Sequence, residues 1–99
     1  MKIDTKVLLK NYKGETLKFL TDDLTVGLAI SQILAQSRTG GKFKIYKLGQ
    51  RFYDEKEVEL DEADFALVEK EVKETDVFTD IVCGQLEEVL QNIKEKVKK

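Results

Sequence analysis

The sequence predicts an α+β fold, in which an N-terminal β-hairpin is followed by three to four helices packed as a small helical domain. Alternating side chains near the N-terminus are typical of strands, whereas later segments repeat their apolar residues every three or four positions, as helices do. The 99 residues are 41% hydrophobic and 36% charged, which suffices for one core and leaves no room for a second. We therefore expect a single domain over residues 1–99.

The hairpin is expected over residues 5–20. Apolar and polar side chains alternate in residues 5–11 and again in residues 15–20. Gly14 lies between these two segments and suits the positive φ of a tight turn. A two-stranded hairpin alone is unstable in water, so we expect it to pack against the helices.

The first helix is predicted for about residues 25–38. Thr25 is a suitable N-cap, and the apolar residues that follow it form one helical stripe. Gly27 falls in the first turn, where glycine costs least and allows close packing. The sequence Arg38-Thr39-Gly40-Gly41 is expected to end the helix and to let the chain reverse direction.

Residues 42–53 are predicted to form the second helix. Ile45, Leu48 and Phe52 are spaced by three and four, as on one side of a helix. The alternation within Phe43-Lys44-Ile45-Tyr46-Lys47 also fits a strand, so a strand over 42–48 remains the alternative.

A third helix is predicted for residues 61–74, after a short extended connector over 57–60. Asp61 is the expected N-cap, and two acidic residues follow it in the first turn, where the helix dipole favours negative charge. Leu60 is placed to pack on Phe65 as a hydrophobic staple.

The last helix, over residues 76–97, is expected to be central to the core. Thr75 or Asp76 is the expected cap. The apolar spacing of four, four, three, four and four predicts one long buried stripe, formed by Phe78, Val82, Leu86, Val89, Ile93 and Val97, with Ile81 and Leu90 widening it. Self-association into a homo-oligomer is also expected, because this helix is long for so small a domain.

Enzyme classes are disfavoured by what the sequence lacks. It has no histidine and a single cysteine, so the usual catalytic triads and zinc sites built from these residues are excluded. The acidic run Asp54-Glu55-Lys56-Glu57 lacks the spacing and the glycine of a calcium loop. We expect no enzymatic activity, no metal and no cofactor, and we interpret Cys83 as a buried structural thiol of a reducing compartment.

Charge is distributed unevenly along the chain, although the net charge is only −2. Residues 38–53 carry a net charge of +5, and residues 54–88 carry −11. An acidic surface over 54–76 would suit a basic protein partner, with candidate protein-binding residues Glu57, Glu59, Glu62 and Glu69. The basic stretch, with aromatic rings among its lysines, is the alternative site for nucleic acid, with candidate residues Lys42, Lys44, Lys47 and Arg51.

A resemblance to a known group of proteins covers about residues 6–90. The order of short motifs resembles a small uncharacterised protein family of tailed bacteriophages and prophages. The motifs are the turn at Gly14, Leu24-Thr25-Val26-Gly27, Tyr46-Lys47-Leu48 with Phe52-Tyr53, Val58-Glu59-Leu60-Asp61, Asp64-Phe65-Ala66-Leu67-Val68, and Gly84-Gln85 with Leu86 and Leu90. The resemblance implies a phage gene product with a hairpin and helices, acting in the cytoplasm of a bacterial host cell. It carries over no activity and no functional residue, and the acidic centre departs from it.

Two hypotheses about function follow. The first is a non-enzymatic phage or prophage accessory or regulatory protein that binds a host or phage protein through the acidic surface. The second is a nucleic-acid-binding regulator that uses the basic stretch, although no known reader motif is present. No membrane association is expected, because the sequence has no long apolar run and its start lacks the apolar block of a signal peptide.

Overall fold

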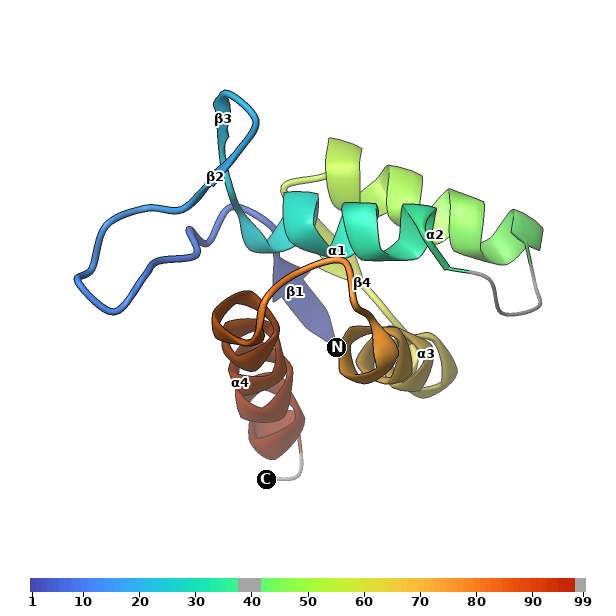
Figure 1. The fold of residues 1–99 in the computed structure, drawn as a ribbon. Coiled ribbons are helices and arrows are strands. Elements are labelled where there is room, and N and C mark those ends of the chain that lie inside the picture. Colours follow the sequence, from blue (N-terminus) through green and yellow to red (C-terminus); the bar gives the residue numbers. More distant parts are fainter. Residues whose placement is uncertain (38–41, 98–99) are drawn as a thin grey trace.

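Four helices follow a small N-terminal β-hairpin, which confirms the predicted α+β fold class (Figure 1). The computed structural model describes residues 1–37 and 42–97. Its strands are β1 (Lys2–Asp4), β2 (Lys18–Phe19), β3 (Asp22–Asp23) and β4 (Glu57–Glu59). Its helices are α1 (Val26–Ala35), α2 (Lys42–Asp54), α3 (Glu62–Glu74) and α4 (Asp80–Val97).

The hairpin is shorter than predicted, and its paired strands lie later in the chain. The strand pair is β2 with β3, and it turns at Leu20 and Thr21 rather than at Gly14. Gly14 does occupy a turn, with a φ of +84°, and backbone hydrogen bonds from Asn11 to Glu15 and from Leu17 to Leu9 join its two sides, although these residues form no regular strands. The backbone N–H of Leu9 donates to Leu24, which lies outside the predicted hairpin, so this segment divides its hydrogen bonds between two partners.

A second two-stranded sheet joins the N-terminus to the middle of the chain. β1 pairs antiparallel with β4, and Ile3 lies opposite Val58. Both side chains are fully buried, while the residues on either side of them face outward. The segment predicted as an extended connector is therefore a strand, and the pairing ties the start of the chain to the beginning of α3.

Helix α1 crosses the middle of the molecule and lies alongside α2 (Figure 1). Thr25 caps it as predicted, because its hydroxyl accepts a hydrogen bond from the N–H of Leu28 at 3.1 Å. The helix ends at Ala35 with Gln36 as its C-cap, so it is shorter than predicted. The glycine pair that was expected to end it lies outside the described residues.

Residues 42–54 form helix α2, which confirms the helix prediction over the strand alternative. Ile45, Leu48 and Phe52 are its buried side chains, so the helix places its one apolar stripe against the core. The aromatic side chains of Phe43, Tyr46 and Tyr53 on this helix are exposed to solvent.

Helix α3 begins as predicted, with the Asp61 carboxylate accepting a hydrogen bond from the N–H of Asp64 at 2.8 Å. The predicted cap of the last helix is wrong. Thr75 follows the end of α3 and accepts a hydrogen bond from the N–H of Val77, while α4 starts only at Asp80. The residues between the two helices are needed to reverse the chain, and they place Phe78 before α4.

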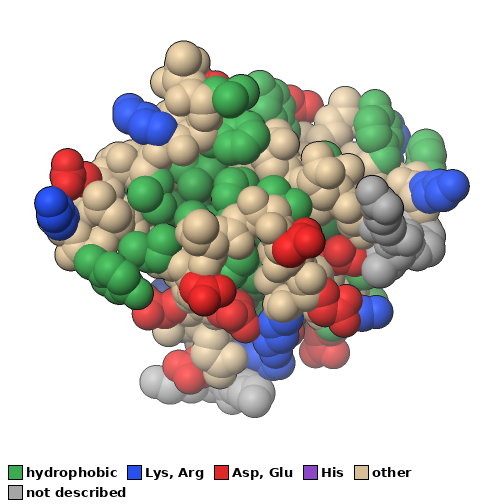
Figure 2. Space-filling model, viewed as in Figure 1, with side chains coloured by type: hydrophobic (Ala, Val, Ile, Leu, Met, Phe, Trp, Pro, Cys, Tyr) green, Lys and Arg blue, Asp and Glu red, His purple; other side chains and the backbone are tan. Residues whose placement is uncertain are grey.

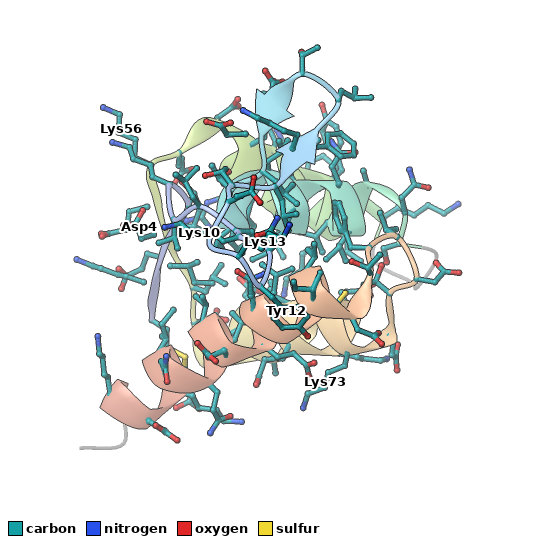
Figure 3. All side chains as sticks on the ribbon, turned by 60° about the vertical axis from the view of Figure 1, so that its left-hand side comes forward. Asp4, Lys10, Tyr12, Lys13, Lys56 and Lys73 are labelled. Carbon is teal, nitrogen blue, oxygen red and sulfur yellow. The ribbon has the colours of Figure 1, made fainter. Side chains whose placement is uncertain are left out.

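The apolar stripe of α4 packs into the core, but its buried part is narrower than predicted. Val82, Leu86 and Leu90 are buried, whereas Val89 and Ile93 are half-buried at the edge of the core. On the other side of α4, the segment that contains Lys10 and Tyr12 passes close to the helix (Figure 3). The Gln85 side chain fastens this segment, because its amide accepts from the N–H of Lys10 at 2.9 Å and donates to the Lys10 carbonyl.

Candidate functional site

The four acidic candidates do not form one uniformly acidic surface. Glu57 and Glu59 point outward from β4, and the Glu57 carboxylate lies 3.8 Å from the Lys2 ammonium. Glu62 is exposed in the first turn of α3. Glu69 lies about 10 Å further along the helix axis, and its carboxylate is 3.5 Å from the Lys94 ammonium. Two of the four acidic side chains therefore have a lysine beside them.

Two of the four basic candidates connect α2 to the acidic segment that follows it. The Lys44 ammonium lies 2.6 Å from the Asp64 carboxylate on α3. The hydrogen bond to Asp64, together with the negative charge, raises the pKa of Lys44. Arg51 pairs with Glu55 at 3.2 Å and donates to the backbone carbonyl of Glu59 at 2.9 Å. These two cations are therefore engaged within the fold.

Lys42 and Lys47 are exposed and make no ion pair with any residue that the structure describes. The Lys47 ammonium lies 5.6 Å from the centre of the Phe43 ring and 5.9 Å from that of Tyr46. Both distances are within the range of cation–π attraction. The contact keeps the positive charge of Lys47 beside two aromatic rings.

The aromatic side chains of α2 face solvent. Phe43, Tyr46 and Tyr53 are 73%, 63% and 68% exposed. Their spacing of three and seven residues places them on one side of the helix, where Tyr46 and Tyr53 border α1 beside the buried stripe. We call Phe43, Tyr46 and Tyr53, with Lys47 beside them, the α2 aromatic face. The sequence showed the rings among the lysines, but their shared outward direction follows only from the helix and its buried side.

A groove of about 360 Å³ runs between α1 and α2, next to the α2 aromatic face. Gly49 is one of the residues that line it, and a Cβ there would sit 3.6 Å from the Leu34 Cβ, an ordinary contact distance. A side chain as small as alanine would thus fit, and glycine leaves that space open. Among the residues that line the groove are Leu34, Ala35, Tyr46, Gly49, Gln50 and Tyr53. We call this feature the α1–α2 groove.

The single thiol is only partly buried, so the predicted buried cysteine is not what the structure shows. The Cys83 Sγ lies 3.7 Å from the carbonyl oxygen of Phe78. Desolvation, with the negative charges of Glu87 and Asp80, raises the pKa of Cys83. At neutral pH the group is therefore mainly the thiol, which is the less nucleophilic form.

Two further properties of residues 1–37 and 42–97 bear on the candidate chemistry. They contain no group of three or more cysteine, aspartate and glutamate side chains arranged to hold a metal ion. Within the same residues, no helix has the length and apolar character needed to cross a membrane.

Comparisons with known proteins identified no relative of this chain. No protein-family model matches the chain. No curated protein and no solved structure matches it either.

Proposed function

We propose that this protein is a non-enzymatic binding protein, a phage or prophage accessory or regulatory protein that docks to another protein through the α2 aromatic face and the α1–α2 groove. The observation that carries the proposal is the set of three largely exposed rings along one side of α2. Exposed aromatic side chains are costly in water and are enriched at protein interfaces, where they contribute much of the binding energy. The adjacent groove offers a depression for an apolar side chain of the partner.

The ion pairs of α2 favour a protein over nucleic acid as the partner. Nucleic-acid backbones are bound by several unpaired cations. On α2, Lys44 and Arg51 are already engaged with Asp64, Glu55 and the Glu59 carbonyl, which leaves Lys42 and Lys47 for phosphate contacts. Aromatic rings that stack on bases act together with such cations, which contact the phosphate backbone of the single-stranded nucleic acid. A partner protein with apolar and acidic side chains needs fewer of them.

The acidic residues form the competing protein-binding surface. Glu59 and Glu62 are exposed without a salt bridge in the described part of the chain, whereas Glu57 and Glu69 each have a lysine close by. Exposed charges at the edge of an interface raise the rate of association more than they raise the affinity of the complex. We therefore place the docking surface on α2 and give the acidic residues a secondary role in steering.

A pull-down with matched variants tests this proposal. Tagged protein is incubated with lysate from phage-infected or host bacteria, with and without nuclease, and the retained proteins are identified by mass spectrometry. We expect one protein to remain after nuclease treatment. The triple change Phe43→Ser, Tyr46→Ser and Tyr53→Ser should remove that protein, because it removes the apolar contacts but no core side chain.

Two further variants separate the alternatives. Reversing the charge of the acidic candidates, Glu57, Glu59, Glu62 and Glu69, should leave capture of the partner largely intact. If this change abolishes capture while the aromatic variant retains it, the acidic surface is the docking site and our proposal is wrong. Loss of all retained material after nuclease treatment would instead establish nucleic acid as the partner. In that case the change of Lys42 and Lys47 to glutamate should weaken binding steeply, as should added salt.

A further inference from the structure

Strand β1 leaves one of its two backbone edges without a partner. Met1, Ile3 and Thr5 direct their backbone groups toward β4 and the residues on either side of it. In an antiparallel pair the intervening residues, Lys2 and Asp4, direct theirs to the opposite edge. Within residues 1–37 and 42–97, the backbone groups of Lys2 and Asp4 have no hydrogen-bond partner. Buried backbone groups are nearly always paired, so this edge of β1 faces solvent.

The exposed face of the β1–β4 sheet carries an excess of negative charge. Lys2, Asp4, Glu57 and Glu59 point away from the core, and of these four only Lys2 is a cation. The register places Lys2 opposite Glu59 and Asp4 opposite Glu57. Like charges that lie opposite each other are unfavourable, so β4 gives Asp4 no favourable neighbour across the strands. Figure 3 shows Asp4 at the margin of the molecule.

A second copy of β1 fits this edge in both geometry and charge. When two copies pair antiparallel about a two-fold axis at Ile3, Lys2 of each copy lies opposite Asp4 of the other. Both residues direct their N–H and C=O groups to this edge, so each of these pairs can form two backbone hydrogen bonds. The pairing also gives Asp4 the cation that β4 does not supply. The sequence of β1 is thus complementary to itself in this register.

We propose that this protein forms a two-fold dimer in which the β1 strands of two copies pair antiparallel, so that two sheets of two strands join into one sheet of four. Exposed sheet edges readily pair with a strand of another chain. Two-fold symmetry is also the commonest symmetry of soluble oligomers. The contact uses none of the residues of the α2 aromatic face, so the dimer is independent of the proposed function.

Sedimentation velocity of the protein, from micromolar to millimolar concentration, tests the dimer and its register. We expect a monomer–dimer equilibrium for the wild type. Asp4→Lys places two lysines opposite each other in both pairs, and Lys2→Asp places two aspartates there. Each change should raise the dissociation constant at least about tenfold. An equimolar mixture of the two variants should restore the dimer, because every pair then joins a lysine to an aspartate.

A second comparison tests the backbone hydrogen bonds. Asp4→Pro removes the N–H that the pairing requires, whereas Asp4→Ala keeps it. Both variants lose the hydrogen bond that the Asp4 carboxylate accepts from the N–H of Lys6 at 2.9 Å, so their difference isolates the backbone donor. We expect Asp4→Pro to dimerise about tenfold more weakly than Asp4→Ala. Urea unfolding at micromolar concentration shows whether each variant still folds, since proline on the free edge of a strand leaves the β1–β4 bonds in place.

The outcomes decide between this contact and another. A wild type that stays monomeric up to millimolar concentration overturns the dimer. A dimer that Asp4→Lys, Lys2→Asp and Asp4→Pro all leave unchanged overturns the β1 pairing, and the contact then lies elsewhere, for example on the hydrophobic side chains that gather in the middle of the face drawn in Figure 2. The triple serine change on α2 should leave the dimer unchanged. Its effect on capture of a partner protein therefore tests the proposed function separately.

Discussion

Gly27 is the residue at which three parts of the chain approach most closely. A Cβ on this residue would lie 2.5 Å from the Cβ of Thr5 and 2.6 Å from the carbonyl oxygen of Phe52. The backbone N–H of Gly27 also donates to the Thr5 carbonyl at 3.0 Å, so the N-terminal strand region cannot move away without losing that bond. We predict that Gly27→Ala lowers the free energy of unfolding by about 1–3 kcal/mol, the usual cost of overpacking.

Urea unfolding followed by circular dichroism measures this effect, and Gly84→Ala provides the control. Gly84 also lies inside a helix, but a Cβ there would meet nothing within 4 Å. Its replacement by alanine should therefore raise the free energy of unfolding by about 1 kcal/mol through helix propensity alone. Equal effects of the two substitutions would show that close packing at Gly27 does not hold α1 in place.

At the scale of elements, α4 is held in the core by a narrower stripe than the sequence suggests. Leu86 is fully buried, whereas Val89 is half-buried. Leu86→Asp should abolish the cooperative unfolding transition, because an unpaired buried charge costs as much as a small domain's whole stability. Val89→Asp should cost only about 1–2 kcal/mol, since its side chain already contacts water. A folded Leu86→Asp protein would contradict this placement of α4.

The segment that passes over α4 depends on one side chain. Gln85 holds both the N–H and the carbonyl of Lys10, and its amide also donates to the Ile81 carbonyl. We predict that Gln85→Ala speeds amide hydrogen exchange at Lys10 and costs about 1 kcal/mol of stability, the net value of such hydrogen bonds.

Gln91→Ala is the matched control for the loss of the hydrogen bonds between Gln85 and Lys10. Gln91 lies on the same helix, and within residues 1–37 and 42–97 its side-chain amide hydrogen-bonds to no residue other than Glu95, at 3.4 Å. Its replacement should leave exchange at Lys10 unchanged. If Gln85→Ala also leaves that exchange unchanged, the segment is held by its backbone contacts with Leu24 and Glu15 instead.

The helices were predictable from sequence because their signals are local. Asp61 and its neighbours mark the start of α3 within a single turn, and the core side of α2 repeats at regular spacing. The β1–β4 pairing was not predictable in this way. Each of these strands has three residues and one buried side chain, and the pairing joins Ile3 to Val58 across most of the chain. No local pattern distinguishes such a strand from a connector.

At the scale of the whole molecule, the basic and acidic stretches that are separate in the sequence lie next to each other in the fold. The basic stretch and the acidic stretch are consecutive in the chain, and the turn into β4 and α3 brings them side by side. Lys44 then meets Asp64, and Arg51 meets Glu55 and the Glu59 carbonyl. Most of the candidate charged residues lie at exposed positions, and four of them have an oppositely charged neighbour that only the three-dimensional arrangement reveals.

This arrangement predicts that the four basic residues of α2 form two pairs that differ in their contribution to stability. Changing Lys44 and Arg51 to glutamate should lower the urea midpoint, because each new carboxylate faces an acidic side chain and the Glu59 carbonyl loses its donor. Changing Lys42 and Lys47 to glutamate should leave the midpoint close to that of the wild type, since neither has an acidic partner among the described residues. High salt should reduce the difference, because it screens exposed charges. If the two double variants are equally stable at low salt, the ion pairs between α2 and the acidic segment contribute nothing to the fold, and all four cations are available for a partner.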